Sequence, residues 1–513
     1  KKKTMKTRYL IASFLLAALS AGLISGCSKQ LKEDPKASLT PGTYFQTQND
    51  LDAAVAGMYA VLAHDGAWGF TNKMTTYFGA DDLTTDPGLN KGNQREFDQL
   101  AGASDNPDIG AMWNGPWQTI YNANNIIANY GQVNSSDAQK NESAGQAYFL
   151  RGLCYYYLVR TFGTLPLVLT TEAGAHPPRS SVDSIYALVI SDLQQAKSML
   201  GTSKTQGMPT TYSASAVLAD VYLTMAGWPL NDATKYDMAA TEAKSVMQSN
   251  VYDLSTPYDK VFTTNNCAES VFALEYSVAG NLPNRSFGST SVPLDEVATD
   301  GSSGWDDFYP EINFFKKAPA CTRTDLTFYT TLKLIQPDKS FVLTPWNSPT
   351  THAQHPYYKK FRAGLNGDGV NETPTAINTI QPSTNKETII VRYPQVLLDF
   401  AEASAMASSG PTSESYDAIN QVRARAGEPP LVTGLSATDF QDSVVSERAY
   451  EFAGEFGMRW FDIVRLQLLN QITAGRDPAE NPLTHPVDQT RYLAPIPYSE
   501  MVLNPNWKQN DGY

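Results

Sequence analysis

Two stretches near the carboxyl end decide the fold: Glu447-Arg448-Ala449-Tyr450-Glu451-Phe452 and Arg459-Trp460-Phe461-Asp462-Ile463-Val464-Arg465. Arg448 and Glu451 stand three residues apart, as do Asp462 and Arg465, so each pair is adjacent on a helix. Opposite charges at this spacing are typical of ion pairs on a helix surface or between packed helices, worth a few tenths of a kcal/mol each. Trp460 and Phe461 are predicted to pack into the core.

Helical periodicity extends outward from these stretches over most of the chain. Apolar residues recur at helical spacing from Leu51 to Leu62, behind a predicted cap at Thr47 with Asp50 in the first turn. Similar patterns predict helices over 113–130, 139–159, 182–200, 214–226, 236–248, 394–408, 412–426, 437–452 and 459–469. Helices of similar length with short connectors predict a mainly α fold built from stacked, tetratricopeptide-like hairpins.

The helical period fades between residues 277 and 386. Gly, Pro, Asn, Ser and Thr accumulate there, which predicts an irregular, loop-rich insertion with short strands. Ordering so long an insertion costs backbone entropy, so we expect it to have a function and to carry the ligand-binding region. The helical scaffold would then comprise residues 41–276 and 387–513 of a single globular domain.

The amino-terminal segment has the order of a lipoprotein signal peptide. Basic residues precede an apolar run from Tyr9 to Leu19, and small residues lead to Ile24-Ser25-Gly26-Cys27. We expect residues 1–26 to be removed, Cys27 to be lipidated and residues 27–40 to form an anchor and tether. A transmembrane anchor is the alternative, but the apolar run is short for a bilayer of about 30 Å and no charged stop follows it.

The charge balance and the cysteines limit the classes of partner and site. The whole chain has a net charge of −13, and removing residues 1–26, with five basic and no acidic groups, lowers it by five to −18. Duplex nucleic acid is therefore an unsuitable partner. Besides Cys27 there are three widely spaced cysteines, Cys154, Cys267 and Cys321, which predict neither a disulfide framework nor a zinc knuckle.

Four stretches together resemble the SusD/RagB family of outer-membrane nutrient-binding lipoproteins. Three are Ala147-Tyr148-Phe149-Leu150-Arg151 running on to Pro166-Leu167, Arg392-Tyr393-Pro394 running on to Ala403, and the Glu447 to Arg465 region. The fourth is Leu493-Ala494-Pro495-Ile496-Pro497, which closes in the final run from Asn504 to Tyr513. Each piece alone is weak, but the set follows the family order from the Cys27 tetrad to the last residue.

The resemblance implies a lipid-anchored protein on the cell surface that captures oligosaccharide and delivers it to a SusC-like TonB-dependent outer-membrane transporter. It implies a tetratricopeptide-like scaffold, no enzymatic activity and no cofactor. Some members of the family deliver peptides instead, so a RagB-like peptide-binding protein is the alternative.

Sugar binding needs a flat aromatic face flanked by polar side chains that satisfy ring hydroxyls. Aromatic residues in predicted loops are therefore the candidates, although simple packing is the alternative for each. The candidate ligand-binding residues are Trp68, Trp305, Asp306, Tyr309, Trp346 and Asn347.

A surface glycoside hydrolase and a metal site are weaker interpretations. A hydrolase would need two facing carboxylates, but Asp306-Asp307 and the similar pair Asp81-Asp82 are adjacent residues, which point in different directions along most backbones. His352 and His355 form an H-x-x-H in a Pro-rich loop, which alone predicts no metal site. The oxygen-rich run Asn366-Gly367-Asp368-Gly369 is compatible with a structural calcium ion but lacks the full loop pattern.

Overall fold

The computed structural model describes residues 44–171, 174, 176–362, 370–373, 376–478, 480 and 482–513, with 370–373 as backbone only. Residues Thr47–Tyr513 form one unit, and the account below concerns this unit. The predicted signal peptide, the lipidation site Cys27 and the tether lie outside the described residues. The calcium-compatible run Asn366-Gly367-Asp368-Gly369 also lies outside them.

All ten predicted helices are present. The first block contains α3 (Gln48–Ala63), α5 (Pro107–Asn129), α6 (Asp137–Phe162), α7 (Val182–Met199), α8 (Thr211–Met225) and α9 (Lys235–Ser249). The second contains α13 (Tyr393–Ala407), α14 (Ser413–Ala426), α15 (Ala437–Glu451) and α16 (Met458–Arg465). The last helix ends earlier than predicted, because Gln467 adopts a left-handed φ of 58°.

Shorter helical segments lie between the long helices and after the last of them. They are α4 (Gly92–Asp98), α10 (Tyr258–Val261), α11 (Ile312–Lys317), α12 (Thr322–Thr327), α17 (Leu469–Ala474) and α18 (Tyr498–Leu503), and the 3-10 turns η1 (Thr71–Tyr77), η2 (Leu89–Lys91), η3 (Tyr130–Gln132), η4 (Gly288–Ser291), η5 (Lys359–Phe361) and η6 (Gln489–Arg491). None of the described helices combines the length and the apolar character that crossing a bilayer requires.

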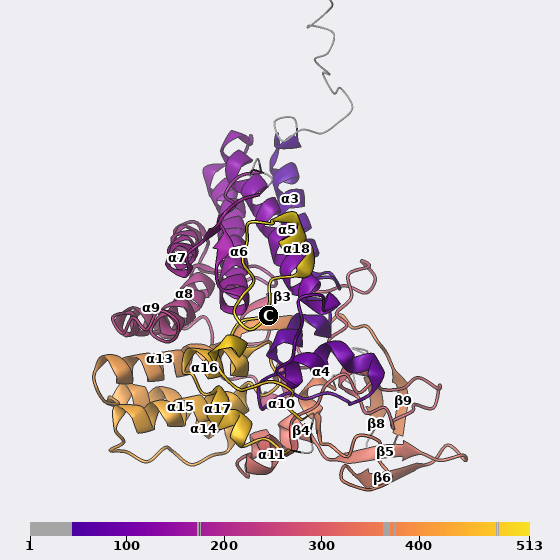
Figure 1. Cartoon of the computed structure of the whole chain (residues 1–513). Helices are drawn as coiled ribbons and strands as arrows, with labels where there is room; N and C mark the ends of the chain where they lie inside the picture. Colours follow the sequence, from indigo (N-terminus) through magenta and orange to yellow (C-terminus); the bar gives the residue numbers. More distant parts are fainter. Residues whose placement is uncertain are drawn as a thin grey trace, which may run out of the picture. The chain divides into compact units, whose positions relative to one another are not determined.

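The long helices pack in a continuous row. Helix α3 packs on α5, and the row continues through α6, α7, α8 and α9 to α13, so the two blocks meet where α9 contacts α13 (Figure 1). Helices α14 and α15 then pack on α13. The predicted cap at the start of α3 is confirmed, because the Thr47 hydroxyl accepts from the Asp50 N–H at 3.4 Å and the Thr47 N–H donates to the Asp50 carboxylate at 2.7 Å. The mainly α, stacked-hairpin prediction is confirmed.

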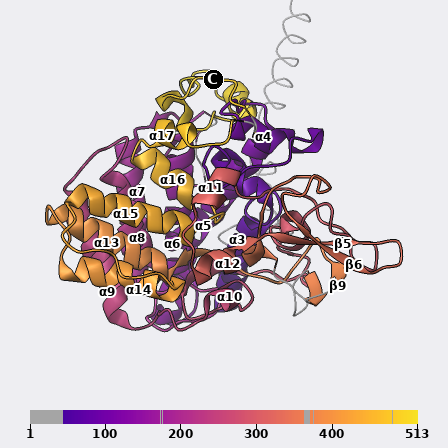
Figure 2. The same ribbon diagram turned by 90° about the horizontal axis from the view of Figure 1, so that it is seen from below.

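Short strands pair between α6 and α7, in the predicted insertion and at the base of the insertion. Antiparallel pairs join β1 (Leu165–Pro166) to β2 (Arg179–Ser180), β3 (Ser270–Leu274) to β10 (Thr388–Arg392), β4 (Phe328–Tyr329) to β7 (Tyr357–Tyr358), β5 (Thr331–Ile335) to β6 (Phe341–Pro345), and β8 (Val370–Thr373) to β9 (Ala376–Ile380). Because β3 and β10 flank the loop-rich region and pair with each other, they close it at its base. Strands β5, β6 and β9 lie on the side opposite α9, α13 and α14 (Figure 1, Figure 2).

The charged residues of the Glu447 to Arg465 region are buried, so of the two predicted settings the helix surface is wrong and pairing between packed helices is confirmed. The Glu451 carboxylate is fully buried and accepts from Arg392 at 2.9 Å, from Arg323 at 3.1 Å and from Arg425. These arginines come from the end of β10, from α12 in the insertion and from α14. Burial raises the Glu451 pKa, but the three guanidinium groups outweigh it and lower the pKa to about 2.

A second buried cluster joins α13, α15 and α16. Arg465 donates to both oxygens of Glu402 at 2.7 Å and to Asp462 at 2.7 Å, and Arg448 donates to Asp462 at 2.9 Å. Of the predicted pairs, Asp462–Arg465 therefore forms, whereas Arg448 and Glu451 contact residues far away in sequence. Breaking such buried pairs costs several kcal/mol rather than a few tenths.

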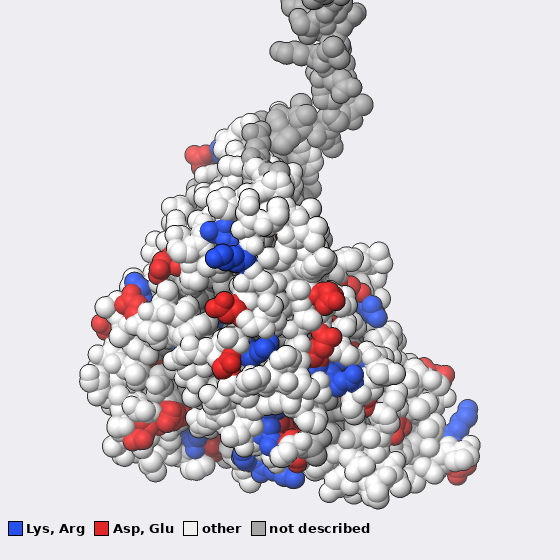
Figure 3. All heavy atoms as spheres, in the orientation of Figure 1, with Lys and Arg blue, Asp and Glu red and all other residues white. Residues whose placement is uncertain are grey.

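The remaining core and surface observations agree with the sequence analysis. Trp460 and Phe461 are 5% and 6% exposed, which confirms their core assignment. Cys154, Cys267 and Cys321 are all free thiols. On the face drawn in Figure 3, Lys and Arg side chains are interspersed with Asp and Glu, so positive charge does not concentrate on that face.

The buried carboxylate of Glu451 yields a first prediction. Glu451→Gln keeps the side-chain shape but removes the charge that three buried arginines share, so the free energy of unfolding should fall by about 3–5 kcal/mol. Urea titration followed by intrinsic fluorescence measures this change. The matched control is Glu414→Gln, which breaks an exposed pair with Lys244 and should cost less than about 1 kcal/mol. Equal effects of the two substitutions would contradict the role assigned to Glu451.

Candidate functional site

A polar cleft with about 1060 Å³ of empty space lies beside Tyr309. Three segments that are far apart in the sequence line it. They comprise Thr84, Thr85, Asp86, Pro87, Gly88, Arg95 and Gln99 from the region around α4, Tyr309, His352, Ala353 and His355 from the insertion, and Glu480 and Pro482 from the carboxyl-terminal region. We call this space the Tyr309 cleft.

Backbone hydrogen bonds fix the first segment against the insertion. The Thr84 N–H donates to the Tyr309 carbonyl at 2.8 Å, and the Tyr309 N–H donates to the Thr84 carbonyl at 3.1 Å. The Thr85 hydroxyl donates to the Asp307 carbonyl at 2.9 Å. Arg95 of α4 donates to the Gly88 carbonyl at 2.8 Å, which holds its guanidinium at the rim. The side chains of this segment are therefore preorganised.

Ion pairs fix the third segment. Buried Arg476 donates to Glu311 at 2.6 Å and also pairs with Asp98 of α4. Glu480 accepts from the Ile312 N–H at 3.0 Å through Oε1, which leaves its second oxygen for the cleft side. The carboxyl-terminal region is thus tied to both other walls.

One polar atom of the cleft residues, the Tyr309 hydroxyl, has no hydrogen-bond partner within the described part of the chain. Tyr309 is 1% exposed, and its ring lies against the His355 imidazole with ring centroids 4.4 Å apart. His355 Nε2 and Glu480 Oε2 lie 3.3 Å apart and pair with each other. Because buried polar atoms are normally hydrogen-bonded, the unpaired Tyr309 hydroxyl beside this pair indicates a polar ligand.

The structure brings four of the six candidate residues into this neighbourhood. Tyr309 lines the cleft, and Asp306 Oδ2 lies 3.2 Å from Nδ1 of the cleft residue His352. Trp346 is half-buried and packs on the cluster of Tyr309, Leu332 and Tyr357, as does the cleft residue Ala353. Asn347 follows Trp346 and is exposed. Their ligand contacts stay a prediction.

The other two candidates lie elsewhere. Trp68 is 3% exposed, and its ring packs edge-on against the rings of Tyr157 and Phe456, with centroids 4.9 Å apart in each pair. The expectation of an exposed aromatic residue in a loop is therefore wrong for Trp68, and the alternative of simple packing is confirmed. Trp305 is half-buried, and the Arg285 guanidinium lies 5.8 Å from its ring centroid. Trp305 is not among the residues that line the Tyr309 cleft.

Sequence reasoning missed the cleft residues outside the insertion. Thr84, Thr85 and Arg95 precede it, and Glu480 follows it by nearly 100 residues. Nothing in their local sequence distinguishes them from ordinary loop or helix residues, because what makes them functional candidates is long-range pairing. The insertion alone therefore does not make the site, although it supplies one wall.

A second cleft has Glu311, the residue that accepts from Arg476, in its lining. It has about 1070 Å³ of empty space, and its lining includes Phe314 and Tyr450, whose rings stack with centroids 4.8 Å apart. Arg459 and Asp81, joined at 2.7 Å, form part of the same wall. Arg459 and Asp81 are thus paired with each other, whereas the Tyr309 hydroxyl of the first cleft has no partner among the described residues.

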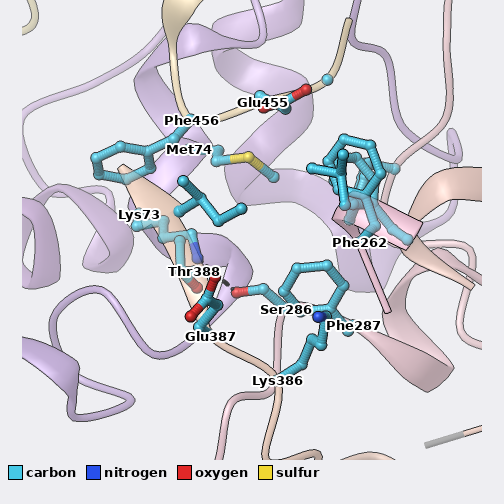
Figure 4. Close-up of a pocket in the computed structure, with 15 residues that line it drawn as sticks. Lys73, Met74, Phe262, Ser286, Phe287, Lys386, Glu387, Thr388, Glu455 and Phe456 are labelled. Carbon is cyan, nitrogen blue, oxygen red and sulfur yellow. Dashed lines mark hydrogen bonds between the residues drawn. The ribbon is translucent and has the colours of Figure 1, made fainter. Parts of the chain in front are cut away.

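A third pocket is smaller and mostly apolar. It has about 540 Å³ of empty space, and its walls include Phe262, Phe287, Phe308, Phe361 and Phe456 (Figure 4). The Lys73 ammonium donates to the Trp68 carbonyl at 3.2 Å and to the Ser286 hydroxyl at 2.8 Å, and burial lowers its pKa to about 7. Five phenylalanine rings leave few partners for sugar hydroxyls, so the Tyr309 cleft is the better candidate for a glycan.

Comparison with known proteins agrees with this architecture. Residues 345–513 match the SusD family, and residues 30–223 match a family described as starch-binding and associating with the outer membrane. Among solved structures, a SusD homologue from Bacteroides thetaiotaomicron superposes with a TM-score of 0.78 at 21% identity, covering 92% of this chain and 98% of that one.

Two further solved structures share the fold and have descriptions that name a glycan. One is described with a xylogluco-oligosaccharide, with a TM-score of 0.72, 19% identity and coverage of 89% of this chain and 97% of that one. The other is described as a laminarin-binding SusD-like protein, with a TM-score of 0.71, 20% identity and coverage of 91% and 100%.

The sequence relationship to one curated relative extends over nearly the full length of both proteins. SusD-like protein P2 from Formosa agariphila is 30% identical, and the alignment covers 95% of this chain and 97% of the relative. Such coverage includes the helical scaffold, the insertion and the motifs at the carboxyl end. The chain therefore belongs to the SusD family.

Proposed function

We propose that this protein is a cell-surface glycan-binding lipoprotein that captures an oligosaccharide in the Tyr309 cleft and delivers it to a SusC-like TonB-dependent transporter. The observation that carries the proposal is one large cleft at which the buried Tyr309 hydroxyl is unpaired within the described residues and lies beside the His355–Glu480 pair. Membership of a family in which structural neighbours are described with xyloglucan fragments and laminarin supports a glycan as the ligand.

The chemistry of the cleft suits sugar hydroxyls, which both donate and accept hydrogen bonds. The Tyr309 hydroxyl can do either, the Glu480 carboxylate accepts and the Arg95 guanidinium donates. Trp346 lies on the adjoining aromatic cluster and offers part of its ring surface for the C–H face of a sugar. The fixed walls reduce the conformational entropy lost on binding.

The proposed cellular location depends on the amino terminus and on the family. Lipidation of Cys27 would anchor the protein, because several acyl chains on one residue suffice for stable attachment. The family description that names association with the outer membrane supports this membrane as the site of attachment. We propose a binding role rather than an enzymatic one, and the description of a structural neighbour as a laminarin-binding SusD-like protein supports this.

Glycan binding should depend on the polar side chains that line the Tyr309 cleft. In affinity gels and calorimetry against a panel of polysaccharides, the purified mature protein should bind at least one glycan. Tyr309→Phe and Glu480→Gln, which retain side-chain shape, should each weaken this binding about 3- to 10-fold through the loss of a hydrogen bond. Glu414→Gln, an exposed substitution on α14, is the control that should leave the affinity unchanged.

The same panel distinguishes the alternatives. Binding to peptides but to no glycan would replace the proposal with a RagB-like peptide carrier. Release of shorter sugars during incubation would replace it with a surface hydrolase. Undiminished binding by both cleft variants would place the ligand outside the Tyr309 cleft.

Membrane attachment should require the thiol of Cys27. In cells that express the full chain, Cys27→Ala should move the protein from the membrane fraction to the soluble fraction, because no acyl chain can then be attached. Fractionation followed by immunoblotting measures the distribution, with Cys321→Ala as the cysteine control. A Cys27→Ala protein that stays in the membrane fraction would contradict the anchor.

Delivery requires a transporter as partner. Affinity purification of the protein from solubilised outer membranes should recover one β-barrel protein of the TonB-dependent class in near-equal amount. Mass spectrometry identifies the co-purifying chain, and membranes from cells without the tagged protein provide the background. Recovery of the protein alone under several mild detergents would contradict a stable transporter complex.

A further inference from the structure

Two carboxylates and one imidazole converge at the wall of the Tyr309 cleft. Asp86 Oδ2 and Asp306 Oδ2 each lie 3.2 Å from Nδ1 of His352, and the three ligand atoms all lie within 4.8 Å of one another. Asp86 and His352 also line the cleft. These residues come from three separate parts of the chain, so the fold itself brings them together.

Each carboxylate is held by its other oxygen. Asp306 Oδ1 accepts from the Tyr357 hydroxyl and from the Leu294 N–H, both at 2.8 Å. Asp86 Oδ1 accepts from the Gly88 N–H at 2.6 Å. In both residues Oδ2 is thereby left to face the imidazole. Such outer hydrogen bonds orient ligands in protein metal sites.

The backbone also fixes the imidazole and the more deeply buried carboxylate. The His352 N–H donates to the Asp295 carboxylate at 2.7 Å. Asp306 has a left-handed φ of 53°, which is uncommon for a residue other than glycine. Since the Asp306 side chain is 2% exposed and that of His352 is 46% exposed, the group is buried on one side and open on the other.

The spacing suits a small divalent ion. A cation about 2.0–2.2 Å from each ligand atom separates neighbouring ligands by roughly 2.9–3.5 Å in tetrahedral or octahedral geometry. Both measured separations of 3.2 Å fall in this range. Two carboxylate oxygens and one imidazole nitrogen favour a transition ion such as Zn²⁺ over Ca²⁺ or Mg²⁺, which prefer all-oxygen sites.

We propose that Asp86, Asp306 and His352 bind one divalent transition-metal ion, with Zn²⁺ as the representative, at the wall of the Tyr309 cleft. Three protein ligands leave at least one coordination position open on the exposed side, where His352 borders the cleft. The site differs from an H-x-x-H pair, because His355 stacks on Tyr309 and faces Glu480 instead.

A protonated His352 between two carboxylates would have the same distances, so metal binding must be measured directly. Isothermal calorimetry with Zn²⁺ as the probe uses the mature protein, stripped with EDTA, without a histidine tag and without glycan. We expect one Zn²⁺ per chain. His352→Ala should weaken binding at least about tenfold, and His176→Ala, which removes an exposed histidine outside the cleft lining, should leave it within about twofold. Ca²⁺ and Mg²⁺ should give no comparable heat.

A second measurement guards against indirect effects. His352 is half-exposed, so its replacement should leave the circular dichroism spectrum unchanged. In crystals of the wild-type protein with Zn²⁺, anomalous X-ray scattering at the zinc edge should show one peak among the three ligand atoms. Absence of zinc binding, equal binding by wild type and His352→Ala, or an anomalous peak elsewhere would overturn the proposal. Because the titration contains no glycan, a failure to bind zinc would not contradict the proposed glycan binding. Likewise, a failure to bind glycan would not contradict the proposed zinc site.

Discussion

The buried carboxylate of Glu451 is the interaction on which the arrangement of the structure depends. It contacts three guanidinium groups, from Arg323 in the insertion, Arg392 at the junction of β10 and α13, and Arg425 in α14. Burying so many charges is costly unless each is paired, and here every arginine has a carboxylate partner. Since β3 and β10 close the insertion next to this group, the same contacts join the loop-rich region to the helical row.

The Tyr309 cleft is a consequence of that junction. The insertion supplies Tyr309, His352 and His355. The region around α4 is held to the insertion by the backbone hydrogen bonds between Thr84 and Tyr309. Arg476 connects the carboxyl-terminal region to both through its ion pairs with Glu311 and Asp98. A site made from three distant segments can retain its framework while individual loops change. This arrangement agrees with a family in which structural neighbours are described with different glycans.

Much of the fold could be predicted from the sequence because local patterns determine it. The spacing of apolar residues predicts the ten long helices, and Thr47 with Asp50 predicts the start of α3. The accumulation of Gly, Pro and Asn predicts the insertion. Long-range pairing could not be predicted in this way. Glu451 has the local spacing of a surface ion pair, and Trp68 has the local context of an exposed loop, yet both are buried by partners distant in sequence. For the same reason Glu480 gave no local sign of its place in the cleft.

Ligand binding in the Tyr309 cleft can be tested most directly by a crystal structure of the mature protein with the oligosaccharide that binds most tightly in a glycan screen. We expect sugar density in contact with Tyr309, His355 and Glu480, with a ring close to Trp346. Density confined to the cleft of Phe314 and Tyr450, or to the pocket of Lys73, with the Tyr309 cleft free of sugar, would contradict this expectation.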